Sequence, residues 1–501
     1  MGRHLWGAAA FMLVLSFAFL NHVIAAEDGA APPPATPTLA ITETSLGKTD
    51  GMVENSLVVS PDCRRAAFVA DRNGKKVVVL DGKAFGEYDG ITAIMFSPDS
   101  KRAVWAVMRG GKAVVVVDGQ DGKEYAAIGS PAFSPNSKRF AYAAKREKDW
   151  VVVLDGVEDG PYESAGEILF SPDSKRFAYV VTMELKSEAN PPAPPKKVGA
   201  VIVDGVAGAQ YDGIVPGTLV FSADSRRVAY AAVRAGKQLF VVDGEEGKDC
   251  DAVSGFKFSD NSKHFAYAAM RDGKGFVVVD GAEETMGDMT GMPVFSTDSK
   301  HLAYAVKKAG KSLVALDGTE GAQYDDVRAE SVVFSPDSTQ ICYAAQRGAK
   351  WLLVTEKVGL KKVEPPPEDT EAEGGPIVRP AGVEGKEYDD ILAGGMKFSG
   401  DGKHVVYAAK RGEKWVAVLD GVEGREYDDI LAGSVMVSPD GAHVAYLARR
   451  EAKWLVAVDG AESAEYDRLI NPGCLLFDSP TKLHALLARG SEIFLIDIEV
   501  K

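Results

Sequence analysis

The chain has 501 residues and a formal net charge of −15, with 72 acidic side chains against 57 Lys and Arg. This excess of negative charge disfavours nucleic acid and anionic membrane surfaces as partners, because both repel an acidic protein. The length would allow about three ordinary domains, but an internal repeat organises nearly the whole sequence.

Residues 1–26 have the pattern of a secretory signal peptide. Arg3 precedes an apolar run over residues 5–20, and small residues allow cleavage after Ala25 or Ala26. A retained anchor is the alternative, although the run is short for a bilayer span of roughly 20 residues. No Cys follows the run, so a lipid-anchored start is not expected. We expect a periplasmic or secreted protein with no membrane span after signal removal.

Residues 27–37 are rich in Ala and Pro, and we predict that they form a disordered linker. From residue 38 to residue 501 a Ser-Pro-Asp turn motif recurs, mostly 37 to 39 residues apart. Two longer intervals hold Pro-rich insertions at 186–198 and 357–381, which we interpret as loops inside repeat units. A degraded copy at 477–480 brings the count to eleven units. The Ser of the motif is Ser60, Ser97, Ser134, Ser171, Ser222, Ser259, Ser296, Ser335, Ser399 and Ser438.

Each unit predicts four short strands joined by tight turns. Ser-Pro-Asp suits a type I turn, with Pro at the first central position and polar side chains that bond back to the backbone. The second strand contains small residues, as in 140–144, and the third is continuously apolar, as in 151–154. A continuous apolar run indicates a strand covered on both faces. The fourth strand, near Tyr88, is short and polar, which suits an exposed edge.

Four strands repeated about every 40 residues, from apolar inner to polar outer, are typical of β-propeller blades. We therefore predict an all-β fold, a β-propeller of about eleven four-stranded blades. The last unit is one strand short, and the strand near residues 39–42 has no blade of its own, so pairing the two would remove an open edge. Natural propellers usually have about four to eight blades, so we favour two rings, for instance of five and six. One large ring and an open arc are the alternatives.

The repeat resembles a known family. Phe-Ser-Pro-Asp-Ser-Lys-Arg at 96–102 and 170–176, followed in the second case by Phe-Ala-Tyr, is similar to the WD-like repeat of TolB-type bacterial propellers. The resemblance covers residues 38–501. The sequence departs from WD repeats in lacking the Gly-His and Trp-Asp dipeptides, and from TolB in lacking a preceding α/β domain and in having nearly twice the blades. The resemblance implies an exported propeller of the interaction kind, without TolB's particular partners.

The repeated acidic residues have a structural interpretation and a functional one. The Asp of Ser-Pro-Asp could suggest a metal ring, but a turn-capping role explains every copy at once. Asp-Gly pairs such as Asp118-Gly119 follow third strands, where a tight turn is needed. They lack the Asp-x-Asp-x-Asp-Gly spacing of a calcium loop. We therefore predict no metal site and no cofactor site.

Charged connections predict either a docking surface or ion pairs between neighbouring blades. Cations lie in the second-to-third connections and anions in the fourth-to-first connections, and both sets emerge on one face of a propeller. We favour ion pairs, each of which contributes little stability. The cations are Arg109, Lys112, Arg146, Lys148, Arg234, Lys237, Arg271, Lys274, Arg411 and Lys414, and the anions are Asp212, Asp325, Asp326, Asp389, Asp390, Asp428 and Asp429.

Aromatic and sulfur-containing residues give no specific site. Four tryptophans at the start of third strands could stack on carbohydrate, but we favour packing between blades. The four cysteines occupy four different units without a C-x-x-C pair, and we expect buried free thiols. The residues concerned are Trp150, Trp351, Trp415 and Trp454, and Cys63, Cys250, Cys342 and Cys474.

The sequence contains no catalytic signature. Histidine is sparse, and neither a G-x-S-x-G elbow nor an H-E-x-x-H motif occurs. We therefore predict no catalytic residue and an exported, non-enzymatic β-propeller that serves as a protein-binding or scaffold module. The alternative is a periplasmic enzyme or carbohydrate-binding propeller with a site in the face loops.

Overall fold

The computed structural model describes residues 36–185, 196–284, 288–289 (backbone only), 291–359, 382–392, 394–470 and 474–501. Residues 37–501 form one compact unit. The predicted signal peptide (1–26) lies outside the described residues, as does the linker (27–37) except for its last two residues. The described residues contain fifty strands and a single 3₁₀ turn, η1 (Ala329–Ser331). Among them, no helix is long and apolar enough to cross a membrane.

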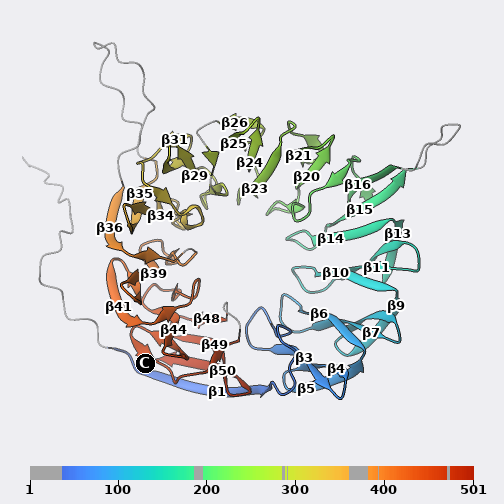
Figure 1. The fold of residues 1–501 in the computed structure, drawn as a ribbon, viewed down its shortest axis with the longest axis horizontal. Coiled ribbons are helices and arrows are strands. Elements are labelled where there is room, and N and C mark those ends of the chain that lie inside the picture. Colours follow the sequence, from blue (N-terminus) through green and yellow to red (C-terminus); the bar gives the residue numbers. More distant parts are fainter. Residues whose placement is uncertain are drawn as a thin grey trace, which may run out of the picture. The chain divides into compact units, whose positions relative to one another are not determined.

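The strands form eleven antiparallel sheets, which confirms the predicted β-propeller of eleven four-stranded blades (Figure 1). We number the blades 1 to 11 by their second strands. Second and third strands form a hairpin at the centre of each blade, and their side chains are mostly buried. The second strands are β3 (Ala66–Arg72), β7 (Ala103–Arg109), β11 (Phe140–Lys145), β15 (Phe177–Leu185), β20 (Val228–Arg234), β24 (Phe265–Arg271), β29 (Leu302–Lys308), β34 (Gln340–Arg347), β39 (Val405–Arg411), β44 (Val444–Arg450) and β49 (Lys482–Arg489).

The third strands read as apolar runs because neighbouring blades cover both of their faces. They are β4 (Lys75–Leu80), β8 (Lys112–Val117), β12 (Trp150–Leu154), β16 (Lys196–Val203), β21 (Lys237–Val242), β25 (Lys274–Val279), β30 (Lys311–Leu316), β35 (Lys350–Lys357), β40 (Lys414–Leu419), β45 (Lys453–Val458) and β50 (Glu492–Val500).

The fourth strands form the outer edge of each blade and are largely exposed. In blades 1 to 10 they are β5 (Lys83–Tyr88), β9 (Gln120–Tyr125), β13 (Val157–Tyr162), β17 (Val206–Ala207), β22 (Glu245–Glu246), β26 (Ala282–Glu284), β31 (Thr319–Glu320), β36 (Val383–Tyr388), β41 (Val422–Tyr427) and β46 (Ala461–Glu462). In blade 11 the N-terminal strand β1 (Leu39–Lys48) takes this place.

The first strands divide the blades into two kinds. Blades 2, 3, 4 and 6 have one continuous strand, whereas blades 5 and 7 to 11 have two short segments separated by a loop; blade 1 has the short β2 (Val58–Val59). The continuous strands are β6 (Gly90–Phe96), β10 (Ala127–Phe133), β14 (Ser164–Phe170) and β23 (Ala252–Phe258). The split pairs are β18 (Gly213–Ile214) and β19 (Val220–Phe221), β27 (Asp288–Met289) and β28 (Val294–Phe295), β32 (Asp326–Val327) and β33 (Val333–Phe334), β37 (Asp390–Ile391) and β38 (Lys397–Phe398), β42 (Asp429–Ile430) and β43 (Met436–Val437), and β47 (Arg468–Leu469) and β48 (Leu475–Ser479).

The Ser-Pro-Asp turn closes on itself through its side chains, as the sequence predicts. Ser97 Oγ donates to Asp99 Oδ1 at 2.6 Å and accepts from Arg102 N at 3.0 Å. Asp99 Oδ1 also accepts from Lys101 N at 3.1 Å. These bonds satisfy the turn backbone, so the turn-capping interpretation is confirmed for this aspartate.

Asp-Gly turns join third and fourth strands, also as predicted. Asp118 and Gly119 both have positive φ, 51° and 86°, which is the conformation of a tight hairpin turn. Asp118 Oδ1 accepts from Ala103 N at 2.9 Å, and Arg102 Nε donates to Asp118 Oδ2 at 3.2 Å. The aspartate therefore also ties the turn to the start of the second strand.

The core lies between blades rather than within them. Val104 and Val115 of blade 2 pack with Tyr142, Val151 and Val153 of blade 3 in one buried cluster, and the same pattern recurs at other junctions. Each blade therefore buries its apolar faces only when a neighbour is present on either side. This is the energetic reason that repeat units of this kind do not fold singly.

The last blade closes on the first, so the eleven blades form one ring and the favoured two-ring arrangement is wrong. β1 pairs with β50 along its length, from Leu39 opposite Val500 to Lys48 opposite Glu492 (Figure 1). His484 Nε2 lies 2.9 Å from Asp62 O, which joins blade 11 to blade 1. In two rings, β1 would have completed a blade in the middle of the chain. The two-ring arrangement also fails because hydrogen bonds join every pair of consecutive blades from blade 3 to blade 7.

A disulfide bond also joins blade 11 to blade 1, so the expectation of four free thiols is wrong. Cys63 of blade 1 is bonded to Cys474 of blade 11, with their Cα atoms 5.4 Å apart. Cys250 and Cys342 are free and buried, as predicted. The two bonded cysteines are 411 residues apart in sequence, and only ring closure makes them neighbours.

The two predicted insertions are shorter than the sequence suggests. Lys196 pairs with Leu185, and Val198 pairs with Met183, so the end of the expected insertion 186–198 belongs to the β15–β16 hairpin. In blade 8, Lys357 still pairs with Gln340 in the β34–β35 hairpin. Residues 186–195 and 360–381 lie outside the described residues.

Candidate binding surface

The anions after the fourth strands are engaged in bonds that hold neighbouring blades together. Asp89 accepts from Lys75 Nζ of its own blade at 2.6 Å and from Gly110 N of the next blade at 2.7 Å. These bonds, with Lys75 as the larger cause, lower the pKa of Asp89. Among the described residues, seven aspartates make both bonds: Asp89, Asp212, Asp251, Asp325, Asp389, Asp428 and Asp467.

These aspartates do form ion pairs with lysines, but the expectation that the pairs join neighbouring blades is wrong for them. The Lys–Asp pair lies within one blade, and a backbone N–H makes the link to the next. Of the ten predicted cations, Lys112, Lys148 and Lys274 have no ion pair among the described residues. Asp326 accepts from Ser312, Asp390 pairs with Arg328, and Asp429 pairs with Arg449.

A second set of pairs anchors the outer strands. Glu423 on β41 pairs with Arg411 of its own blade at 2.7 Å and accepts from the Tyr388 hydroxyl of the preceding blade at 3.2 Å. Glu43 on β1 repeats this arrangement with Arg489 and Tyr466, so β1 is held like the outer strand of any other blade. These charged side chains are therefore engaged in contacts within and between the blades.

The third-strand tryptophans are half-buried and pack between blades. Trp351, Trp415 and Trp454 lie against the clusters at the junctions of blades 8 and 9, 9 and 10, and 10 and 11. The guanidinium of Arg328 lies 4.3 Å from the centroid of the Trp351 ring. These contacts favour the packing interpretation over carbohydrate stacking. Trp150 is also half-buried and lies opposite Tyr162 in the sheet.

The described histidines hold turns. His264, His301, His404 and His443 occupy the place of the turn arginine in their blades, and each Nδ1 lies 2.6 to 2.7 Å from the Asp of the Asp-Gly turn. His484 is buried at the closure of the ring beside Asp478. Among the described residues, no group of three or more His, Cys, Asp or Glu side chains could hold a metal ion.

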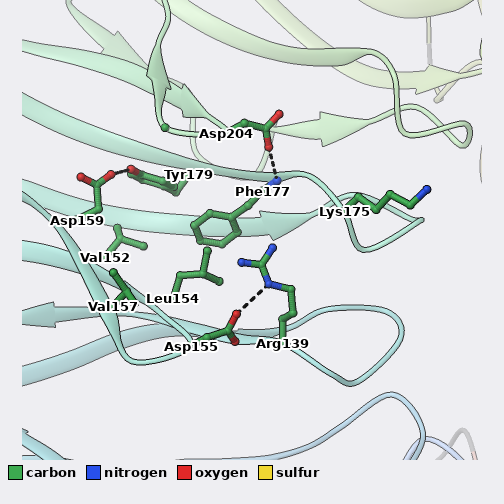
Figure 2. A pocket seen from close by; sticks show the side chains of 11 residues that line it. Arg139, Val152, Leu154, Asp155, Val157, Asp159, Lys175, Phe177, Tyr179 and Asp204 are labelled. Carbon is green, nitrogen blue, oxygen red and sulfur yellow. Dashed lines mark hydrogen bonds and ion pairs between the residues drawn. The ribbon is translucent and has the colours of Figure 1, made fainter.

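A cavity of about 430 Å³ lies at the junction of blades 3 and 4. Figure 2 shows Val152, Leu154 and Phe177 lining it, with Arg139 and Asp155 on the blade 3 side. Asp159 lies beside Tyr179, whose hydroxyl donates to its carboxylate. We call this cavity the blade 3–4 groove; its lining also includes Val157, Lys175, Asp204 and Gly205.

Two exposed valines stand at and next to the groove. Val157 is 72% exposed, and Val206, which follows the lining residue Gly205, is 70% exposed. Both stand directly after an Asp-Gly turn, in adjacent blades. Val422 occupies the same position in blade 9 and is 71% exposed, and Val383, the first residue of the fourth strand of blade 8, is 79% exposed.

The groove was not predicted, although the sequence contains one signal of it. Asp159 stands where most other outer strands have glycine, for example Gly208 and Gly424. In those blades the glycine lies close to the tyrosine of the next blade. An aspartate at this place instead accepts a hydrogen bond from that tyrosine, and the departure from the repeat marks the junction as different.

The sequence matches no family model and no curated protein. Among solved structures it is similar to TolB from Acinetobacter baumannii, with 13% identity, a TM-score of 0.23, and coverage of 50% of this chain and 75% of TolB. It is also similar to the β-propeller domain of the Trilobed protease from Pyrococcus furiosus (12% identity, TM-score 0.26, covering 54% and 92%). A eukaryotic initiation factor structure gives 11% identity and a TM-score of 0.35, covering 73% and 96%. Scores this low carry no conclusion about function, and the propeller fold is established by the strand topology itself.

Proposed function

We propose that this protein is an exported, non-enzymatic β-propeller that binds a protein partner, and that the blade 3–4 groove is its binding site. The observation that carries the proposal is the groove itself. Val152, Leu154 and Phe177 form the apolar part of a cavity whose lining also includes the exposed Val157, and the exposed Val206 follows the lining residue Gly205. An apolar cavity joined to exposed apolar side chains is typical of a surface that a partner covers.

Export is supported by three features. The sequence begins with a signal-peptide pattern, and the ring closes through a disulfide between Cys63 and Cys474. Disulfides persist in oxidising compartments such as the periplasm or the exterior, and they are rare in the cytosol. The repeat motif also resembles that of exported TolB-type propellers. A periplasmic or secreted location accounts for all three features.

A binding role, rather than catalysis, agrees with how the polar side chains are used. The acidic residues after the fourth strands bond to lysines and to backbone N–H groups of the next blade. The described histidines bond to turn aspartates. These groups stabilise the ring, which leaves the apolar groove as the surface best suited to recognition.

Affinity capture with a groove variant tests this function. The mature protein and its Val157→Asp variant are immobilised and incubated with extract of the cell envelope. Val422→Asp is the matched control, because Val422 has the same position and exposure in blade 9. We expect a partner that the wild type and Val422→Asp retain and Val157→Asp loses. Equal capture by all three proteins would contradict the groove as binding site.

A further inference from the structure

Arg139, the arginine of the blade 3–4 groove, has equivalents at the same turn position in other blades. The hydrogen bonds of these equivalents show what such a side chain is suited to bind. Arg227 Nε donates to Asp243 of its own blade at 2.7 Å. Its Nη1 donates to two consecutive main-chain carbonyls of the next blade, Ser262 O at 3.3 Å and Lys263 O at 2.9 Å. Arg65 and Arg176 make the same pair of carbonyl bonds at their junctions.

Arg139 keeps the first of these interactions and lacks the second. Its Nε donates to Asp155 Oδ2 at 2.9 Å, and its guanidinium lies 5.7 Å from the centroid of the Phe170 ring. Among the described residues, no carbonyl of blade 4 accepts a hydrogen bond from Arg139. Figure 2 shows its terminal nitrogens directed into the groove between Leu154 and Phe177. The groove therefore contains N–H donors of the kind that Arg65, Arg176 and Arg227 use for main-chain carbonyls. Within the described part of the chain, Arg102 of blade 2 likewise bonds to its own Asp118 and to no carbonyl of blade 3.

The rest of the groove is suited to an uncharged aliphatic group. Its carboxylates already have partners: Asp155 pairs with Arg139, Asp204 pairs with Arg176, and Asp159 accepts from Tyr179. Lys175 is exposed at the rim. A volume of about 430 Å³ lies near the lower end of the range for ligand pockets. This volume suits a side chain with its adjoining backbone.

Resting on the proposed function, we propose that the groove binds an extended peptide segment of the partner. A main-chain carbonyl oxygen of the segment accepts hydrogen bonds from the Nη groups of Arg139. An aliphatic side chain of the segment inserts between Leu154, Phe177 and Val157. Planar guanidinium groups hold such acceptors in a defined geometry, which a lysine ammonium does not reproduce. The groove thus recognises one aliphatic side chain and the peptide backbone next to it.

The test uses the capped tripeptide acetyl-Ala-Leu-Ala-amide and the full mature protein labelled at Leu and Val methyl groups. Titration to about 10 mM should shift the methyl signals of Leu154 and Val157, since we expect a dissociation constant on the order of 1 mM for so small a ligand. Arg139→Lys should weaken binding about tenfold, the effect of losing a charge-assisted hydrogen bond.

Arg102→Lys is the matched control, because Arg102 has the same aspartate pair and the same stacking on a phenylalanine in blade 2. It should leave the titration unchanged. A second peptide, acetyl-Ala-Asp-Ala-amide, should produce no shift at these methyl groups. Both arginine variants should otherwise keep the wild-type methyl spectrum, which shows that the ring is folded.

Three results would overturn the inference: no shift with the leucine peptide, equal shifts with the aspartate peptide, or equal affinity of Arg139→Lys. If these occur while Val157→Asp still abolishes capture of the partner, the binding function stands and only the peptide mode fails. If the leucine peptide binds as expected but capture does not depend on Val157, the proposed function fails instead.

Discussion

Cys63 of blade 1 stands at the position where seven other blades have a serine whose hydroxyl accepts a hydrogen bond from the preceding blade. Ser100 Oγ, for example, accepts from Asp62 N of blade 1 at 3.0 Å. At the junction of blades 11 and 1, Cys63 instead forms a covalent bond to Cys474. The seven serines are Ser100, Ser137, Ser174, Ser225, Ser262, Ser299 and Ser338.

Removal of this disulfide should weaken the ring at its closure. We expect the double variant Cys63→Ser, Cys474→Ser to lose about 2–5 kcal/mol of unfolding free energy, as small domains do when a native disulfide is removed. The measurement is thermal and urea unfolding without reductant. Cys250→Ser, at a buried free thiol in blade 5, is the control and should change stability little. An unchanged midpoint for the double variant would show that the closure does not depend on the bond.

The closing strand should make stability depend on pH through Glu43. Hydrogen bonds from Arg489 and then Tyr466 lower the pKa of Glu43 below its ordinary value of 4.5. A carboxylate with a lowered folded-state pKa stabilises the fold above that ordinary value, and the stabilisation is lost as the pH falls through the folded-state pKa. Glu43→Gln should therefore reduce the unfolding free energy at neutral pH, by up to about 1 kcal/mol.

The same difference should disappear in acid, because wild-type Glu43 is then protonated. Urea unfolding of both proteins at neutral pH and well below pH 4.5 measures it. Glu499→Gln, at an exposed pair with Lys482 in the same blade, is the control. A difference between Glu43→Gln and wild type that persists undiminished in acid would exclude an electrostatic role for this carboxylate.

The insertion in blade 4 should be dispensable if the strands on either side are kept. Residues 186–195 connect Leu185 to Lys196, which are paired in the sheet. Replacing them with the Asp-Gly turn that joins β24 and β25 should change the unfolding free energy by only about 1 kcal/mol, because loop closure depends weakly on length. Deletion of residues 188–197 should cost more, since it also removes Lys196 and Lys197, which pair with Asp212 and Glu163. Equal thermal midpoints for both deletions would contradict this.

The N-terminus of the mature protein tests the proposed export. Mass spectrometry of protein isolated from its own cells should find a chain that begins near Ala26 or Glu27. Intact residues 1–25 in membrane-extracted material would instead support a retained anchor.

The blade was predictable from the sequence because its determinants are local. Ser97 and Asp99 form their turn within a few residues, and the Asp118–Gly119 turn adopts positive φ from its own chemistry. The number of rings was not predictable in this way. Repeats encode how each blade meets the next, whereas closure depends on β1 and β50, at opposite ends of the sequence.

The disulfide and the groove were missed for related reasons. The Cys63–Cys474 bond depends on which units become neighbours at closure, and a repeat pattern alone does not determine that. The groove depends on how the side chains of blades 3 and 4 are placed at their junction, and homologous side chains differ in position there. Arg139 and Arg176 follow the same motif in the sequence, yet only Arg176 bonds to the next blade.

The central claim is that eleven blades close into one ring in an oxidising compartment, and disulfide mapping tests it most directly. Protein isolated from its own cells is alkylated without reduction, digested and analysed by mass spectrometry. The account predicts a linked pair of peptides containing Cys63 and Cys474, with Cys250 and Cys342 alkylated as free thiols. Alkylated Cys63 and Cys474, or either one bonded to a different cysteine, would contradict it.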